Sequence, residues 1–427
     1  VTLTTRKAGA DAADGVRWQS GGSGEYTLEQ VEVPARGTSV TLQLKPGEDE
    51  FLDGWKLREL VKRYSDHVAF PIRLRAESDG KPTGEFETVN HAVALWTLPK
   101  ADISDDDSRA FYKSLSHHFN DALAWTHNRV EGSQSYTSLL YLPEKPPFDA
   151  VFSGRDERQG LKLYIRRVFI MDASEQLLPA YLRFVRGVID SADLPLNVSR
   201  EILQENRLVA QIRSACVKRT LDLLDRLAKD EPEKFAQFTS AFGNVLKEGI
   251  AEDGANRERI ARLLRFASTH GEDASRNVAL DDYIARMPAG QEVIWYITAD
   301  SWLAARNSPQ IESLKARGVE VLLLGERIDE WMIGYLHEYA GKQLRNAAKG
   351  ELDAADGSDA QAREQAAAAA QPVLDKLRQS LGDAVDKVQV GQRLTQSPAC
   401  IVLGEYDMAP HMQRLLREAG HDVPASK

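Results

Sequence analysis

The sequence predicts a multidomain α/β (α+β) protein, and three observations support this fold class. The chain has 427 residues, which at roughly 150 residues per domain corresponds to about three domains. Strand-like alternation in residues 38–44 gives way to helix-like periodicity in residues 49–64. A strand, a helix and a second strand follow one another in residues 293–324, an order that is typical of a parallel βαβ crossover.

The charge balance and the two cysteines limit the classes of function. The chain has 54 lysines and arginines against 64 aspartates and glutamates, a net charge of −10. This excess of acid argues against nucleic acid as a partner, because binding the phosphate backbone needs a concentrated basic surface. Cys216 and Cys400 lie far apart in the sequence. We therefore expect two buried thiols in a reducing compartment, and neither a disulfide nor a zinc site.

The apolar runs, such as residues 321–324, are too short to span a bilayer. No basic segment followed by an apolar segment opens the sequence. We therefore expect a cytoplasmic protein with no membrane partner. Because the first residue is Val1 and not methionine, we also expect an excised part of a longer protein.

Residues 1–76 predict strand, strand, strand, helix and strand, in that order. The helix is the apolar stripe in residues 49–64, and the last strand is residues 70–74. A single helix cannot cover both faces of such a sheet, so we expect this segment to be one part of a larger domain. The alternation in residues 38–44 predicts one apolar face of a half-buried strand, made of Val40, Leu42 and Leu44.

Residues 77–91 are polar and contain turn-forming residues at 79–82, which is typical of a linker or of a long hairpin. The following residues, up to about 280, predict a mixture of strands and helices. The long helix from Ser199 has about 30 residues, and we expect its apolar side to be buried: Leu208, Ile212, Cys216, Leu223 and Leu227. Before it we expect a helix at 109–119 and strands at 136–142, 161–169 and 185–189.

The crossover unit consists of a strand at 293–297, a helix at 309–317 and a strand at 319–324. Gly318 directly follows the helix, where glycine commonly ends helices because it adopts a left-handed backbone without strain. We therefore expect the two strands to be parallel neighbours in one small sheet.

Residues 346–371 contain few large apolar side chains, so we expect an exposed helix or a tether there. From Pro372 onward the sequence predicts a further helix and a strand at 400–403. These two elements begin a domain that the sequence does not complete.

Two candidate ligand sites are weak. The glycine-rich residues 20–24 lack the Lys-Ser or Lys-Thr pair and the following helix of a phosphate-binding loop, so a turn explains them better. His117, His118 and His127 are the only histidine cluster. Neighbouring helix positions point about 100° apart, so the adjacent pair cannot face one metal ion. We expect no metal site.

The start of the long helix combines several hydrogen-bond donors. Asn197 or Ser199 can cap the helix, Arg200 falls in its first turn, and Gln204 lies on the same face as Arg200. Exposed N–H groups, a guanidinium and an amide together can bind an anion, above all a phosphate. The alternative is a surface arginine paired with a carboxylate, and from composition alone we favour this alternative.

Three segments of the central region carry a resemblance to a known family, namely LKLYIRRVFIMD at 161–172, LLPAYLRFVRG at 177–187 and DLPLNVSRE at 193–201. Shorter motifs agree in order and spacing, namely YSDH at 64–67, VEG at 130–132 and IDEWM at 328–332. On these motifs the chain resembles the 90-kDa heat-shock protein family of molecular chaperones, in its bacterial form, over essentially its whole length.

The resemblance implies a division into five parts. Residues 1–76 are expected to be the end of a GHKL-type (gyrase, MutL and histidine-kinase) ATP-binding α/β sandwich, with a linker at 77–91. Residues 92–345 are expected to be a middle domain. After it we expect a linker at 346–371 and the start of a C-terminal α/β dimerisation domain at 372–427. Within the middle domain, we expect α/β/α layers to about residue 230, a helical coil to about residue 280 and a small βαβ unit to about residue 345.

The family's function implies ATP-dependent folding and remodelling of client proteins by a homodimer, with ATP and Mg as cofactors. The family's catalytic glutamate, magnesium-binding asparagine and adenine-binding aspartate have no counterpart in this sequence. We therefore expect no ATPase activity and no bound nucleotide in this chain alone, and a monomeric or weakly associated state. The implied partners are unfolded or partly folded clients, with cochaperones.

By this resemblance, Arg200 contacts the γ-phosphate when the nucleotide-binding domain docks, and Asn197 and Gln204 belong to the same catalytic loop and helix. The role fits the chemistry, because a guanidinium can neutralise the charge that phosphoryl transfer spreads over oxygen atoms. Gly37 and Thr38 match part of the nucleotide pocket, as a remnant of it.

The resemblance also assigns client contacts to Trp331, Glu330 and Phe119. Core packing is the alternative for each aromatic residue, and for Phe119 we favour it. One wide helical stripe is expected, made of Ile328, Trp331, Met332, Tyr335, Leu336 and Tyr339; of these, we expect Ile328 and Leu336 to be core.

A different class of function, a nucleotide-independent module that binds clients or cochaperones, is the main alternative. The acidic charge disfavours a DNA-repair or topoisomerase subunit.

Overall fold

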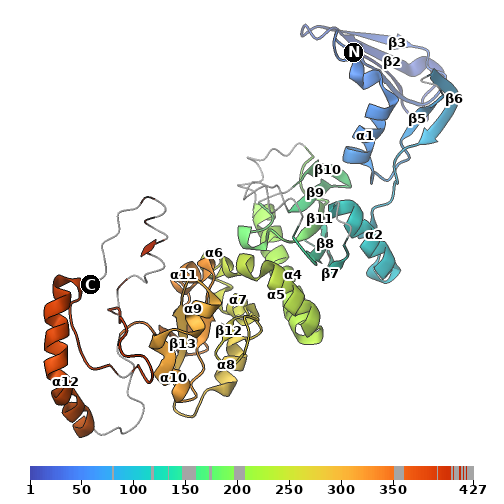
Figure 1. Ribbon diagram of the computed structural model, residues 1–427. Coiled ribbons are helices and arrows are strands. Elements are labelled where there is room, and N and C mark those ends of the chain that lie inside the picture. Colours follow the sequence, from blue (N-terminus) through green and yellow to red (C-terminus); the bar gives the residue numbers. More distant parts are fainter. Residues whose placement is uncertain are drawn as a thin grey trace. The chain divides into compact units, whose positions relative to one another are not determined.

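The computed structural model describes residues 1–78, 81–116, 120–132, 134–146, 160–172, 176–196, 207–350, 360–391 and 393–404, together with 407, 413, 414, 417 and 420. The chain forms two compact units, Val1–Ala94 and Leu95–Lys427, and each is described by itself (Figure 1). The mixed α/β class predicted from the sequence is confirmed.

The unit Val1–Ala94 contains a four-stranded sheet, one helix and a hairpin. The strand order is β3-β2-β1-β4, with antiparallel pairing throughout. Of the linker and hairpin alternatives for residues 77–91, the structure has the hairpin, in which β5 pairs antiparallel with β6. The elements are β1 Thr2–Arg6, β2 Gly15–Ser20, β3 Tyr26–Val31, β4 Gly37–Thr41, α1 Gly54–Ser65, β5 Arg73–Ser78 and β6 Lys81–Thr88.

The predicted half-buried strand at residues 38–44 is wrong in both extent and burial. Strand β4 ends at Thr41, and all of its residues are exposed. Val40 is 57% exposed and Leu42 is 62% exposed. The strand lies at the edge of the sheet, and alternation predicts which residues share a face but not whether another element covers that face.

The unit Leu95–Lys427 begins with a five-stranded sheet of order β10-β9-β11-β8-β7. All neighbours are antiparallel except β9 and β11, which are parallel. The predicted strand at 136–142 is confirmed as β8, and the predicted run 161–169 is the hairpin of β9 and β10. The strands are β7 Ala122–Val130, β8 Tyr136–Pro143, β9 Leu161–Ile165, β10 Val168–Met171 and β11 Arg186–Ser191.

Strand β8 shows how this sheet is covered on both faces. Successive residues of a strand point to opposite faces. Leu140 and Leu142 belong to a buried cluster that includes Ile212 of α4 (Arg207–Asp230). Tyr141 points to the other face, toward α2 (Asp105–Ser116), where its ring centroid lies 5.3 Å from that of Tyr112. Helices therefore pack on both sides of the strand.

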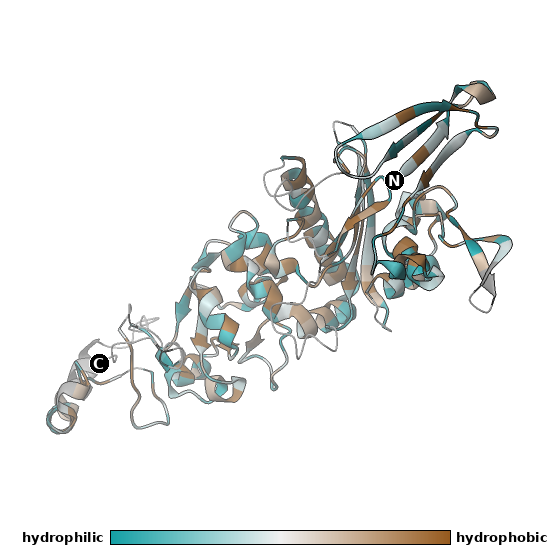
Figure 2. Cartoon of the chain, turned by 90° about the horizontal axis from the view of Figure 1, so that it is seen from above, coloured by the Kyte–Doolittle hydropathy of each residue, from teal (hydrophilic) through white to brown (hydrophobic). Residues whose placement is uncertain are grey.

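The buried side of α4 matches the prediction closely. Ile212, Cys216, Leu223 and Leu227 are all buried, while Leu208 is half-buried. Residues 199–206 of the predicted helix lie outside the described residues. Three more helices of this region are α5 Pro232–Lys247, α7 Arg257–Leu263 and α8 Leu280–Arg286. Figure 2 shows apolar and hydrophilic residues interspersed along the helices, as an amphipathic pattern requires.

The predicted parallel crossover is confirmed in a second five-stranded sheet, of order β12-β14-β13-β16-β15. Strand β13 is parallel to both β14 and β16. Gly318 has a φ of +69°, the left-handed conformation expected of a helix stop. The elements are β12 Ala267–Ser268, β13 Val293–Thr298, α9 Trp302–Arg306, α10 Glu312–Ala316, β14 Leu322–Leu324, α11 Arg327–Ile333, β15 Glu338–Tyr339 and β16 Lys342–Asn346.

The C-terminal region departs from the prediction in two ways. One helix, α12 (Ala360–Leu381), runs through Pro372, where the sequence predicts a new helix. The predicted strand at 400–403 is wrong, because only Leu403 forms a bridge, with Lys349. The segment is instead held by hydrogen bonds to loops, including the backbone N–H of Leu403 to the carbonyl of Ala348.

Candidate functional site

The residues predicted to contact phosphate, Arg200, Asn197 and Gln204, lie outside the described residues, as does Phe119. The structure describes both ends of the segment that contains the first three. Leu194, before it, is 1% exposed and Val209, after it, is 2% exposed, and both belong to the main buried cluster. The described residues on both sides of this segment are therefore part of the core.

Gly37 and Thr38 lie on the exposed edge strand β4. The hydroxyl oxygens of Thr38 and Thr5 are 2.7 Å apart, and the Thr5 hydroxyl also donates to the carbonyl of Gly37 at 3.2 Å. In the described part of the chain, no group of three or more His, Cys, Asp or Glu residues is placed to hold a metal ion. The two hydroxyl contacts of Thr5 join β4 to its neighbour β1.

Helix α11 carries Trp331 and Glu330, and its first turn is closed by a capping box. Asp329 accepts the backbone N–H of Glu326 at 3.0 Å, which satisfies a donor that the helix leaves without an intrahelical partner. The spacing of Glu326 and Asp329 is a signal for this helix start that is visible in the sequence.

A buried ion pair attaches α11 to α5. The ammonium of Lys247 contacts the second carboxylate oxygen of Asp329, and both side chains are 2% exposed. Lys247 also lies 5.4 Å from the centroid of the Phe266 ring. Sequence reasoning missed this pair, because its two members lie 82 residues apart and no local pattern connects them.

Trp331 and Tyr335 form an exposed aromatic pair. Trp331 is 37% exposed and Tyr335 is 44% exposed, and their ring centroids lie 5.5 Å apart in an edge-to-face arrangement. Glu330 is buried at 9% exposed. Burial, together with the charge of Glu330, raises the pKa of Tyr296. Trp331 and Tyr335 thus offer an accessible apolar surface, whereas Glu330 faces the interior.

The predicted helical stripe is wrong in its extent. Helix α11 ends at Ile333, with Gly334 as its C-cap, so Tyr335 and Leu336 lie beyond the helix and Tyr339 belongs to β15. Leu336 is 1% exposed, which confirms it as core. Ile328 is half-buried. Ending the helix after Ile333 lets Tyr335 turn outward while Leu336 packs inward.

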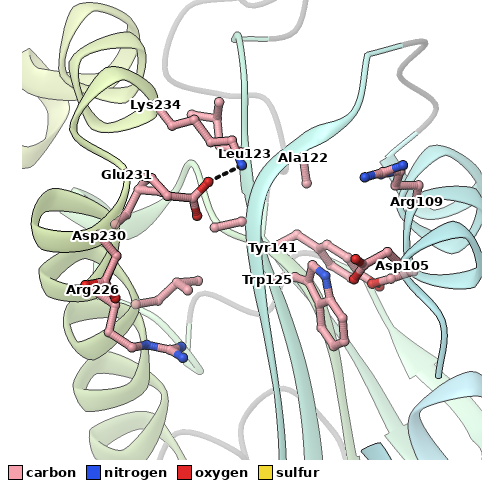
Figure 3. A pocket seen from close by; sticks show the side chains of 14 residues that line it. Asp105, Arg109, Ala122, Leu123, Trp125, Tyr141, Arg226, Asp230, Glu231 and Lys234 are labelled. Atoms are coloured by element: carbon pink, nitrogen blue, oxygen red, sulfur yellow. Dashed lines mark hydrogen bonds and ion pairs between the residues drawn. The ribbon is translucent and has the colours of Figure 1, made fainter. Parts of the chain in front are cut away.

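A pocket of about 330 Å³ lies between α2, the start of β7 and the junction of α4 with α5. Lys234 and Glu231 form an ion pair on its wall (Figure 3). The lining carries three acidic and three basic side chains, so it has no net charge with which to select a phosphate: Asp105, Asp230 and Glu231, and Arg109, Arg226 and Lys234. Ala122 and Trp125 of β7 lie between the two charged sides.

Cys216 and His127 are buried, and Cys400 is half-buried. Cys216 is 1% exposed, and burial raises the pKa of its thiol to about 12. Cys400 is half-buried. Burial lowers the pKa of His127, whose Nε2 lies 2.8 Å from the carbonyl oxygen of Trp96. The predicted burial is therefore confirmed for Cys216 but not for Cys400, which is only partly buried. His117 and His118 lie outside the described residues.

Within the part of the chain that the structure describes, no helix is long and apolar enough to cross a bilayer.

A protein-family model described as Hsp90 protein matches residues 79–426 of the chain.

Three relatives illustrate the similarity, and all are named chaperone protein HtpG. The protein of Alkalilimnicola ehrlichii is 54% identical over 441 residues, covering 100% of this chain and 67% of the relative. The protein of Nitrosococcus oceani is 52% identical, covering 99% of this chain and 68% of the relative. The protein of Bordetella pertussis is 52% identical, covering 100% and 68%. The chain therefore spans about two thirds of the length of these relatives. It belongs to the Hsp90 family of chaperones, and within that family to the bacterial HtpG type.

Proposed function

We propose that this chain binds partly folded client proteins through the surface formed by Trp331 and Tyr335. The observation that carries the proposal is an exposed aromatic pair at the end of a helix that is fixed to the core. Large aromatic side chains supply much of the binding energy at protein interfaces when they are held in place. The Lys247–Asp329 ion pair and the buried Leu336 fix the two sides of this surface.

The test is suppression of aggregation of an unfolding protein by this chain, measured by light scattering without ATP. Trp331→Ala is expected to weaken suppression several-fold. The matched control is Trp55→Ala, because Trp55 is 68% exposed but lies in the unit Val1–Ala94. Equal suppression by the wild-type chain and Trp331→Ala would exclude this surface.

In the full-length protein, we further propose that ATP hydrolysis drives client remodelling and that Arg200 supplies charge stabilisation to the γ-phosphate. The membership of the bacterial HtpG type supports this role. A guanidinium suits it because its planar donors bind phosphate oxygens in a bidentate way. The chain alone is proposed to lack ATPase activity, so nucleotide turnover by the purified chain would contradict this part of the proposal.

The second candidate is a binding module that works without nucleotide. The exposed Trp331–Tyr335 pair favours it, because a client can reach that surface without any nucleotide-dependent step. The same assay separates the two functions. Suppression by the full-length protein that does not change when ATP is added supports the module, whereas release of clients on ATP addition supports the ATP-driven chaperone.

A further inference from the structure

The backbone that leads into the Arg200 segment is anchored at several points. The backbone N–H of Arg166 donates to the carbonyl of Ser191, and its side-chain Nε donates to the carbonyl of Ala192, both at 3.1 Å. The backbone N–H of Ser135 donates to the carboxylate of Asp193 at 2.6 Å. Residues 191–193 are therefore tied to two neighbouring turns before the chain reaches Leu194.

The buried carboxylate of Asp190 stabilises this arrangement through two hydrogen bonds. It is 9% exposed, and one carboxylate oxygen accepts the indole N–H of Trp96 at 2.8 Å. The other oxygen accepts the backbone N–H of Arg167 at 3.2 Å. A buried carboxylate with two donors from different elements is costly to disturb, because losing one donor leaves a desolvated charge less well satisfied.

The turn that Asp190 holds is strained. Arg166 and Arg167 have φ values of +50° and +68°, a left-handed conformation that non-glycine residues rarely adopt. Such backbone persists only where surrounding contacts determine it. Here the contacts are those of Asp190 and the two carbonyls that Arg166 binds, so the shape of the turn and the path of residues 191–193 depend on each other.

Trp96 connects this arrangement to the start of its unit. It is the second residue of the unit Leu95–Lys427, directly after the boundary with Val1–Ala94. Its side chain is fully buried, and its ring centroid lies 4.8 Å from that of Tyr164 in β9. The second unit therefore begins next to Trp96, whose indole N–H donates a hydrogen bond to Asp190.

We propose that Asp190 is a positioning residue, which couples the segment entering at Trp96 to the backbone leading to Arg200. Asp190 does not touch nucleotide in this proposal. It affects the rate by fixing residues 191–194, the described residues that precede the Arg200 segment. The proposal rests on the role proposed above for Arg200.

The test is steady-state ATPase activity of the full-length protein carrying Asp190→Asn, Trp96→Phe or both. Each single change is expected to lower kcat by about 10-fold to 100-fold with KM within about twofold, because small misplacements of a catalytic group have effects of this size. Trp96→Phe keeps an aromatic ring in the core but removes the donor. If the two residues act through one contact, the double variant is no slower than the slower single variant.

Trp125→Phe is the matched control, because Trp125 lies on β7 in the same unit and lines the pocket of Figure 3. It is expected to leave kcat unchanged. The second readout is amide hydrogen exchange at Arg167 and Leu194, which is expected to accelerate in Asp190→Asn at temperatures where the rest of the unit stays protected.

The outcomes separate this inference from the proposed function. If Arg200→Ala leaves kcat unchanged, the catalytic role proposed for Arg200 is wrong, and Asp190 then has no catalytic residue to position. If Arg200→Ala lowers kcat but Asp190→Asn and Trp96→Phe leave it at the wild-type value, only the coupling is overturned. A lower unfolding temperature with unchanged kcat also overturns it, since it shows a purely structural role for Asp190.

Discussion

The ammonium of Lys247 at the end of α5 is buried against the carboxylate of Asp329 in the first turn of α11. This contact joins α5 to the helix that carries Trp331. Because Asp329 also caps α11 through the backbone of Glu326, one carboxylate both starts the helix and attaches it to its neighbour. The orientation of Trp331 therefore depends on a residue far away in sequence.

Removing one member of this pair is expected to be strongly destabilising. Lys247→Met leaves the Asp329 charge buried without its cation, at a cost of about 3–5 kcal/mol in the free energy of unfolding. Urea unfolding followed by tryptophan fluorescence measures this loss. Lys218→Met, which removes an exposed pair with Asp222, is the control and is expected to cost less than about 0.5 kcal/mol. Equal losses in the two variants would contradict the buried-pair argument.

Neutralising Asp329 as well is expected to recover part of the stability. Lys247→Met with Asp329→Asn removes the buried charge but keeps a side-chain oxygen that can accept the Glu326 N–H. The double variant should therefore unfold at a higher urea concentration than Lys247→Met alone. A lower midpoint for the double variant would show that the cap, and not the charge, dominates.

The aromatic pair is expected to bind clients as one surface. Trp331 and Tyr335 pack edge to face, an arrangement worth about 0.5–1.5 kcal/mol beyond area burial, so each ring orients the other. Tyr335→Ala should weaken aggregation suppression, and Trp331→Ala with Tyr335→Ala should be little worse than Trp331→Ala. Independent, additive losses measured by light scattering would indicate two separate contacts.

Gly187 in β11 has no room for a side chain. A Cβ there would lie 2.1 Å from the carbonyl oxygen of Leu139 in the neighbouring strand β8. Gly187→Ala is therefore expected to destabilise this unit by about 1–3 kcal/mol or more, as overpacking does. The control is Gly243→Ala in α5, where the nearest atom is 3.9 Å away; it should stabilise by about 0.5–1 kcal/mol. Thermal unfolding of both variants tests the contrast.

The attachment of residues 395–397 is expected to depend on pH through Glu312. Its carboxylate accepts the backbone N–H groups of Thr395, Gln396 and Ser397 at 2.8, 2.9 and 3.1 Å. These bonds, with the Ser397 hydroxyl, lower the pKa of Glu312 from 4.5 to about 2. Because the pKa of Glu312 is lowered, the stabilisation that its carboxylate gives to the attachment of residues 395–397 is present above pH 4.5. This stabilisation is lost as the pH falls from 4.5 toward 2.

Amide hydrogen exchange at Thr395, Gln396 and Ser397 measures this dependence. Protection should be constant above pH 5 after correction for intrinsic exchange, and should fall as the pH approaches about 2. Glu312→Gln removes the titrating group, so its protection should be low and independent of pH in this range. A Glu312→Gln chain with wild-type pH dependence would mean that another group controls the attachment.

Arg200 is expected to affect turnover more than nucleotide affinity. In the full-length protein, Arg200→Ala should lower kcat while nucleotide affinity changes little, because an arginine that meets developing phosphate charge acts mainly in the transition state. Arginine fingers are worth about 10³–10⁵ in rate, an upper range here because a domain-docking step can limit turnover. Equal losses in affinity and rate would instead indicate ground-state binding.

Local patterns predicted the elements whose formation depends on neighbours in sequence. The buried side of α4, the parallel crossover and the helix stop at Gly318 all follow from periodicity and from glycine's backbone freedom. The family likewise follows from ordered motifs in the printed sequence. Strand β7 was missed because its sequence does not alternate: residues 122–125 are all apolar and residues 126–129 are all polar.

The tertiary structure alone decided which of the predicted faces are buried and which distant groups meet. Val40 in β4 and Leu42 just after it are both exposed, because alternation does not determine whether another element covers the face on which they lie. The pairs Lys247–Asp329 and Trp96–Asp190 join residues 82 and 94 positions apart. Periodicity describes one element at a time, whereas burial and charge pairing depend on how separate elements pack, so only the folded chain determines them.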